Sequence, residues 1–275
     1  MLSPAFVWSE GCESIFHICG TASGWHTAAM DTYTGTHIIY IAVVFLLAGL
    51  VKGTTGMGLP TVAVALLSLV MAPMEAAALL VMPSLLTNGW QMLSGPPLYP
   101  LWQRLRGMMA GICLGTLVGG AVMLQTQGGG MVLGLALVLY GLLGLSSWEW
   151  RLADDSPHWL APVVGGATGV LTAATGVFVL PAVPYLQALR LDKEELVQAM
   201  GLSFVVSTLA LAVVLAAHDA WQPAAAGVSF LAQLPAVAGM LLGQRLRRRL
   251  KPETFRRCLL LVLLLLGVHL VVANG

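Results

Sequence analysis

The chain has 275 residues, of which 58% are hydrophobic and only 9% are charged. Soluble domains carry about 25% charged residues, so this composition excludes an ordinary soluble domain and predicts an integral membrane protein with little polar surface. The formal net charge of +1 gives no electrostatic reason to expect a nucleic-acid partner.

The N-terminal segment, residues 1–36, differs from the rest of the chain. It is mixed in composition and contains no Lys or Arg. We expect a poorly ordered N-terminal extension, because nothing in it predicts a packed element. Met30-Asp31 directly precedes the first strongly apolar run, so a native start at this point is an open alternative for residues 1–29.

Apolar stretches follow one another along the remainder of the chain. They cover roughly 37–51, 57–72, 75–94, 105–124, 130–150, 159–174, 176–189, 195–217, 224–244 and 255–273. The longer ones are near the 20 or so residues that a helix needs to cross a bilayer core. The fold class is therefore all-α, as a polytopic membrane protein.

Two breaks rich in glycine, threonine and proline interrupt these stretches, at Lys52 to Pro60 and at Thr172 to Pro181. Glycine costs about 1 kcal/mol relative to alanine in a helix, and proline lacks an N–H. Irregular backbone at membrane depth occurs only where it is buried in protein or lines a wet cavity. Corresponding breaks in two halves of a chain indicate the binding site of a transporter.

The positive charges predict the orientation in the membrane. Of the 13 Lys and Arg residues, all except Lys52 fall in four segments: 104–106, 151–157, 190–195 and 245–257. The intervening loops at 72–75, 125–130 and 218–223 contain none. The positive-inside rule therefore assigns the four basic segments to the cytoplasm.

This orientation requires residues 37–72 and 158–189 each to form a hairpin that begins and ends on one side. Each half then contains one broken-helix hairpin and three transmembrane helices, so the second half enters the membrane inverted. We predict a transmembrane repeat at 37–150, a cytoplasmic linker at 151–157 and a second repeat at 158–275.

The breaks also predict an anion site. A helix that starts at a break presents unpaired N–H groups carrying about half a positive charge, and two such ends from inverted halves would meet. The candidate backbone donors lie in Thr55, Gly56, Met57 and Gly58 and in Thr175, Gly176, Val177 and Phe178, with the hydroxyls of Thr54, Thr55 and Thr175 beside them.

Three further polar side chains have two interpretations each. A charge at membrane depth is costly and usually functional, so Lys52 either complements an anion or extends to a lipid headgroup. Asn88 and Gln198, in the helices after the breaks, either bind the solute or make ordinary interhelical hydrogen bonds.

Gly111-x-x-x-Gly115 and Gly239-x-x-x-Gly243 occupy equivalent places in the two halves. Such spacing lets helices approach closely, either within one chain or between copies in a homo-oligomer. No hydrolase or nucleotide-binding motif is present, so we expect no enzyme activity, no cofactor and no metal. An ion gradient or the solute's own gradient would then supply the energy for transport.

The sequence resembles the sulfite exporter TauE/SafE family of membrane permeases over about residues 37–273. The resemblance rests on Gly53-Thr54-Thr55-Gly56-Met57-Gly58-Leu59-Pro60 with Ala76-Ala77-Ala78, on Thr175-Gly176-Val177-Phe178-Val179-Leu180-Pro181-Ala182 with Gln198-Ala199, and on Gly239-x-x-x-Gly243-Gln244-Arg245. It implies export of sulfite, a small organosulfonate or a related anion.

We therefore expect a multi-pass permease of a bacterial inner membrane that exports a small anion by alternating access. Two alternatives stay open from the residues themselves. In a carrier for a neutral or cationic solute, unwound carbonyls would face the ligand. A membrane scaffold would transport nothing and would have no use for unwound backbone at depth.

Overall fold

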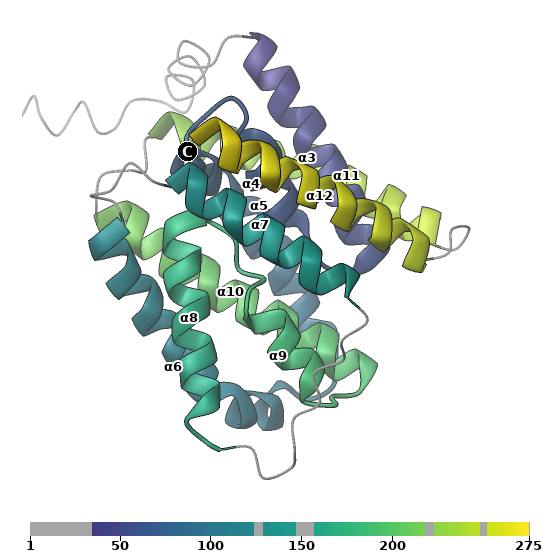
Figure 1. The fold of residues 1–275 in the computed structure, drawn as a ribbon. Coiled ribbons are helices and arrows are strands. Elements are labelled where there is room, and N and C mark those ends of the chain that lie inside the picture. Colours follow the sequence, from purple (N-terminus) through teal and green to yellow (C-terminus); the bar gives the residue numbers. More distant parts are fainter. Residues whose placement is uncertain (1–34, 124–128, 147–156, 218–222, 248–251, 275) are drawn as a thin grey trace, which may run out of the picture.

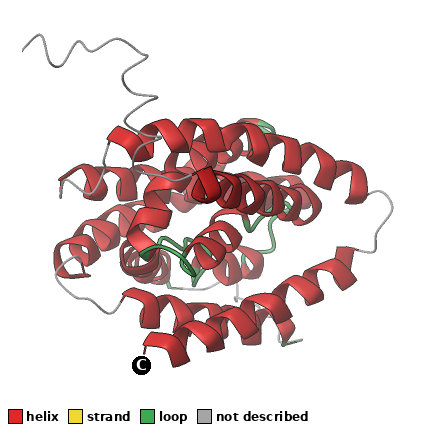
Figure 2. Ribbon diagram, turned by 90° about the horizontal axis from the view of Figure 1, so that it is seen from above, coloured by secondary structure: helices red, strands yellow, loops and turns green. Residues whose placement is uncertain are grey.

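The computed structural model describes residues 35–123, 129–146, 157–217, 223–247 and 252–274. These segments form ten α-helices and contain no strand (Figure 1 and Figure 2). The all-α prediction is confirmed. The predicted extension at 1–36 and linker at 151–157 lie outside the described residues, apart from residues 35, 36 and 157.

The helices follow the same order in both halves of the chain. The first half contains α3 (Gly35–Thr55), α4 (Leu59–Leu67), α5 (Pro73–Leu93), α6 (Leu98–Met123) and α7 (Gly129–Leu145). The second contains α8 (Leu160–Thr175), α9 (Ala182–Ala188), α10 (Lys193–Ala217), α11 (Pro223–Arg247) and α12 (Pro252–Asn274). Each half therefore begins with one long and one short helix and continues with three further helices.

The helices of the two halves pack in matching pairs. α6 packs on α8 as α11 packs on α3, and α6 contacts α10 as α11 contacts α5. The remaining large interfaces join α5 to α10 and α7 to α12. Helices α7 and α12 lie side by side in Figure 1. Exchanging α3–α7 for α8–α12 maps this set of interfaces onto itself, which is the packing expected of two related repeats.

Equivalent helices of the two halves run in opposite directions. Gly130 at the start of α7 faces Asn274 at the end of α12, and Gly144 near the other end of α7 faces Leu260. In α5 and α10, Gln91 Nε2 donates to the carbonyl of Val197 at 2.8 Å, so the end of α5 meets the start of α10. Antiparallel equivalents are what an inverted repeat requires. The exact repeat boundaries stay predictions.

Glycines allow the two largest matching interfaces to close. A Cβ atom added at Gly239 or Gly243 of α11 would overlap a backbone carbonyl of α3, at Leu46 or Leu50. The same holds on α6 at Gly111 and Gly115, which face backbone carbonyls of α8. Both predicted small-residue motifs therefore pack within one chain. Their partners are two further motifs of the same spacing, Gly49-x-x-x-Gly53 and Gly165-x-x-x-Gly169.

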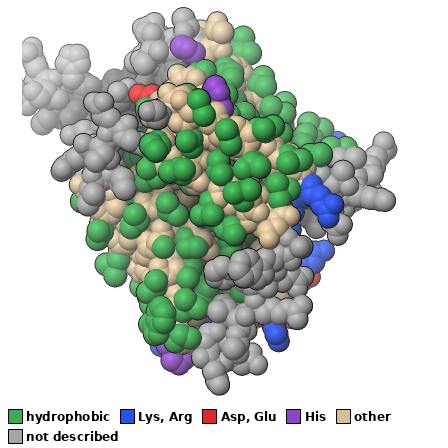
Figure 3. Space-filling view, viewed as in Figure 1, with side chains coloured by type: hydrophobic (Ala, Val, Ile, Leu, Met, Phe, Trp, Pro, Cys, Tyr) green, Lys and Arg blue, Asp and Glu red, His purple; other side chains and the backbone are tan. Residues whose placement is uncertain are grey.

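The outer surface is suited to lipid. Four helical segments are long and apolar enough to cross a membrane by length and composition: Gly35–Thr55, Lys193–Ala217, Gly227–Leu246 and Arg256–Asn274. Figure 3 shows a face covered largely by apolar side chains, with most of the visible Lys and Arg along one edge. Arg104, in a segment predicted to be cytoplasmic, donates to the carbonyl of Leu189 at 3.1 Å, the residue directly before the predicted cytoplasmic segment 190–195.

Each half contains the predicted hairpin. The breaks start later than predicted, because the helix before each break extends further, to Thr55 and to Thr175. The hydroxyl of Tyr40, in the second turn of α3, donates to the carbonyl of Leu66 at the end of α4, at 2.6 Å. The first hairpin therefore folds back on itself. α3 continues through Lys52 to Thr55 because the helical turn closes only at Gly56. The predicted apolar stretch at 176–189 is helical only from Ala182.

Candidate functional site

The first break consists of three residues, Gly56, Met57 and Gly58, between α3 and α4. Gly56 has φ +82° and Gly58 has φ +98°, a left-handed conformation that glycine adopts without steric cost. The Gly56 amide donates to the Lys52 carbonyl at 2.8 Å and so closes α3. The Met57 amide donates to Thr55 Oγ1 at 3.3 Å. The chain thus turns back at a defined loop with its first amides satisfied internally.

The second break repeats this geometry between α8 and α9. Gly176 has φ +70°, and its amide donates to the Thr172 carbonyl at 2.8 Å. The Val177 amide donates to Thr175 Oγ1 at 3.1 Å. In both halves, the hydroxyl of the threonine before the glycine accepts a hydrogen bond from the amide after the glycine. Lys52 and Thr172 occupy equivalent positions, since the carbonyl of each accepts from the glycine amide.

These bonds alter the predicted set of anion donors. The amides of Gly56, Met57, Gly176 and Val177 are engaged within their loops. The hydroxyls of the predicted threonines donate to carbonyls of the preceding helical turn; these are Thr54, Thr55 and Thr175. Their role in the structure is to shape the breaks. At the start of α4, however, the amides of Gly58, Leu59 and Thr61 have no partner among the described residues.

Lys52 is the charged residue of the first break. Its side chain is only 4% exposed, although it lies on a helix that crosses an apolar layer. Its Nζ donates to Oδ1 of Asn88 on α5. Among the described residues no carboxylate pairs with it. The interpretation in which Lys52 extends to a lipid headgroup is therefore wrong, because the ammonium is held inside the protein.

Unpaired polar side-chain atoms lie on α5, the helix whose Asn88 contacts this lysine. Asn88 and Ser84 are both fully buried and one helical turn apart on α5, hence on one face. Nδ2 of Asn88 and Oγ of Ser84 have no hydrogen-bond partner among the described residues. A buried polar group without a partner costs about 1–3 kcal/mol, so these two atoms are candidates for contact with a bound solute or water. Sequence reasoning missed Ser84, which its spacing from Asn88 could have revealed.

The first break is only partly enclosed. Thr55, Gly56 and Met57 are half-buried, and a Cβ added at Gly56 would meet nothing within 4 Å. Gly56 directly follows α3, and its amide closes the helical turn that begins at Lys52. Tyr140 of α7 approaches Met57, with its hydroxyl 4.0 Å from the sulfur. No sequence signal pointed to Tyr140.

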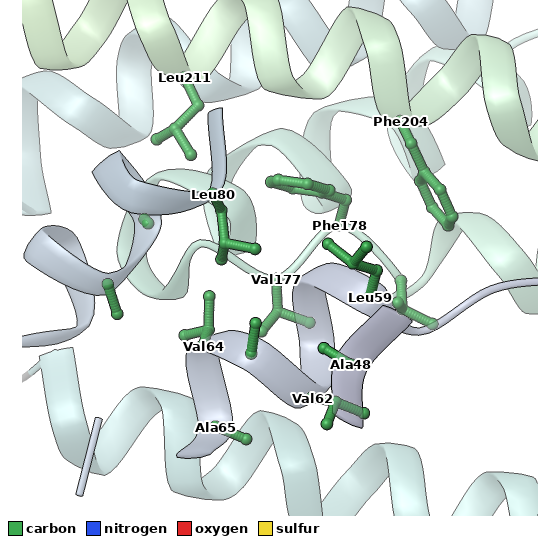
Figure 4. Close-up of a cluster of buried hydrophobic side chains, with 14 of the residues drawn as sticks. Ala48, Leu59, Val62, Val64, Ala65, Leu80, Val177, Phe178, Phe204 and Leu211 are labelled. Atoms are coloured by element: carbon green, nitrogen blue, oxygen red, sulfur yellow. The ribbon is translucent and has the colours of Figure 1, made fainter. Parts of the chain in front are cut away.

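The second break is closed and apolar. A Cβ added at Gly176 would lie 2.7 Å from Cβ of Ala77. Phe178 and Phe204 are buried, with ring centroids 6.2 Å apart. Figure 4 shows Phe178 among apolar side chains that include Val177 and Leu59. The two breaks thus begin alike, with a left-handed glycine after a threonine, but the second is longer, at residues 176–181 against 56–58. Their surroundings also differ, since there is open space at Gly56 and close packing at Gly176.

Gln198 lies apart from Lys52. Its Nε2 donates to the carbonyls of Met92 and Pro96, both at 2.9 Å, and so ties α10 to the end of α5. Its hydrogen bonds reach neither break. The structure brings together Lys52 and Asn88 from the predicted ligands and leaves Gln198 about one turn further along the α5–α10 interface.

Two antiparallel halves, each with a broken hairpin, and a buried lysine at one break are an arrangement typical of membrane carriers. A family model described as Sulfite exporter TauE/SafE matches residues 41–270. The chain belongs to this family of membrane transporters. Neither an individually curated protein nor a solved structure shows a comparable similarity to the chain.

Proposed function

We propose that this protein exports a small sulfur oxyanion, sulfite or an organosulfonate, and binds it at the first break between Lys52 and the start of α4. The observation that carries the proposal is the buried ammonium of Lys52, whose hydrogen-bond partner among the described residues is the amide oxygen of Asn88. A buried charge is stable only when it is compensated, and an anionic substrate supplies the compensation.

Neutral donors around the lysine suit the oxygens of such a substrate. Nδ2 of Asn88 and Oγ of Ser84 are unpaired, and the free amides at the start of α4 carry the positive end of a helix dipole. A sulfite or sulfonate group has three oxygens, each able to accept such bonds. The same arrangement disfavours a cationic solute, because an ammonium repels it.

The difference between the two breaks supports alternating access. Equivalent loops are open at Gly56 and packed at Gly176. In a protein with inverted repeats, the two halves can exchange these conformations, which would close the first break and open the second. The substrate site would then face the two sides of the membrane in turn, and the hairpins would rock against the helices that flank them.

The test is transport by the purified full chain in liposomes. Sulfite, methanesulfonate, sulfate and a neutral sugar are offered, with and without a pH gradient, and empty liposomes give the background. The proposal predicts saturable movement of sulfite or of the sulfonate and none of the sugar. Sugar transport would favour a carrier of neutral solutes, and no transport by folded protein would favour a scaffold.

A further inference from the structure

The core formed by the described residues contains one formal charge, that of Lys52. Among the described side chains, Lys52 is the only buried Lys or Arg; the others are exposed, namely Arg104, Arg106, Arg190, Lys193, Arg245, Arg256 and Arg257. The described carboxylates are also outside the core: Glu75, Asp192 and Glu194 are exposed, and Glu195 is half-buried. The site therefore offers a net charge of +1 to whatever binds there.

This value limits the charge of the substrate. A monovalent anion beside Lys52 forms a neutral pair within the protein. A divalent anion would leave one negative charge uncompensated in a medium of low dielectric constant, where such charges are strongly disfavoured. The half charge of the α4 N-terminus cannot balance it.

The remaining groups at the site are neutral. Asn88 Nδ2, Ser84 Oγ and the amides of Gly58 and Leu59 contribute hydrogen bonds and no formal charge. They can orient the oxygens of a bound anion, but they add no formal charge that would neutralise a second negative charge. Discrimination by charge is therefore left to the single lysine.

We infer that the site selects monovalent oxyanions, namely hydrogensulfite or a sulfonate with one charge, and rejects divalent ones such as the sulfite dianion and sulfate. This inference rests on the proposed function. It identifies the form of the substrate that is carried, since sulfite changes from a monovalent to a divalent anion near neutral pH.

The experiment compares three anions in liposomes containing the full chain. Methanesulfonate is monovalent throughout the range, sulfate is divalent, and sulfite passes from one form to the other. Flux into empty liposomes is subtracted. Dividing sulfite flux by methanesulfonate flux at each pH removes any effect of pH on the protein itself.

We expect the ratio to fall about tenfold per pH unit above the second ionisation of sulfite, and sulfate flux to stay at background. A ratio that does not change with pH, or sulfate flux equal to that of methanesulfonate, would overturn the charge selection while leaving the anion permease intact. No flux of any anion would overturn the proposed function as well.

A matched variant separates the buried charge from the surface charges. Arg245→Gln removes one positive charge from an exposed position near the end of α11. The pH dependence of the flux ratio should be the same in this variant as in the natural chain. A ratio that becomes independent of pH in Arg245→Gln would assign the selection to the surface and contradict the inference.

Discussion

Lys52 on α3 and Asn88 on α5 are joined by a hydrogen bond from Nζ to Oδ1, and both side chains are buried. The bond fixes the ammonium at the first break without neutralising it, because an amide oxygen carries no formal charge. Nδ2 of the same Asn88 side chain has no hydrogen-bond partner among the described residues. The pair thus holds one positive charge and one free donor at the same place.

A carboxylate in place of the amide should disable this site. Asn88→Asp would give Lys52 an internal counter-ion, which competes with a substrate anion for the same ammonium. We expect methanesulfonate flux to fall at least about tenfold, corresponding to about 1.4 kcal/mol of binding, while the melting temperature does not fall. Flux and thermal unfolding are measured on the same preparation.

The matched control is Asn274→Asp, which makes the same change at an exposed position. Its flux should equal that of the natural chain. Unchanged flux in Asn88→Asp would mean that Lys52 does not meet the substrate.

The glycines of the two breaks should respond differently to the same substitution. Alanine in the left-handed conformation costs about 1–2 kcal/mol at either site. At Gly176 the new methyl group would also lie 2.7 Å from Cβ of Ala77, whereas Gly56 has open space. Thermal unfolding should therefore show a larger loss of stability for Gly176→Ala than for Gly56→Ala. Equal losses would contradict the difference in packing.

Access to the first break can be measured by thiol labelling. The four cysteines of the chain are first replaced by serine, and Gly56→Cys or Gly176→Cys is then introduced. We expect a maleimide to label position 56 faster than position 176, because only Gly56 is half-buried beside open space. Methanesulfonate should slow the reaction at position 56. Labelling that methanesulfonate does not affect would place the substrate elsewhere.

The crossing of α3 and α11 depends on the absence of a side chain at Gly239. A methyl group there would overlap the carbonyl of Leu46, so Gly239→Ala should lower the melting temperature. Gly89→Ala is the control, because a Cβ at that helical position meets nothing within 4 Å. Alanine favours a helix over glycine by about 1 kcal/mol, so this variant should be as stable as the natural chain or more so. Similar loss in both variants would contradict the close crossing.

Much of the fold could be predicted because the lengths of the apolar stretches and the positions of Lys and Arg can be read directly along the chain. The hairpins, the helix order and the inverted halves follow from these two signals. The residues at which the breaks start could not be predicted from these signals. The end of α3 at Thr55 depends on the hydrogen bond of the Gly56 amide, and hence on the backbone conformation of Gly56. The motif Gly49-x-x-x-Gly53 was visible in the sequence, but its partner on α11 is fixed only by tertiary packing.

The site was predicted in part for the same reason. Lys52 and Asn88 could be selected separately as polar residues in apolar helices, yet their pairing joins positions 36 residues apart and needs the fold. Gln198 looked equivalent to Asn88 in the sequence, but α10 directs it to the carbonyls of Met92 and Pro96. Tyr140 reaches the first break from α7, which no local pattern could indicate.

The measurement that tests the central claim most directly is anion flux in Lys52→Gln. Glutamine keeps much of the length and can still donate to Asn88, but it removes the one buried positive charge. Hydrogen bonds to charged groups contribute about 1.5–3 kcal/mol, so flux of methanesulfonate at subsaturating concentration should fall about 10- to 150-fold in folded protein. Flux equal to that of the natural chain would contradict the assignment of Lys52 as the substrate's counter-ion.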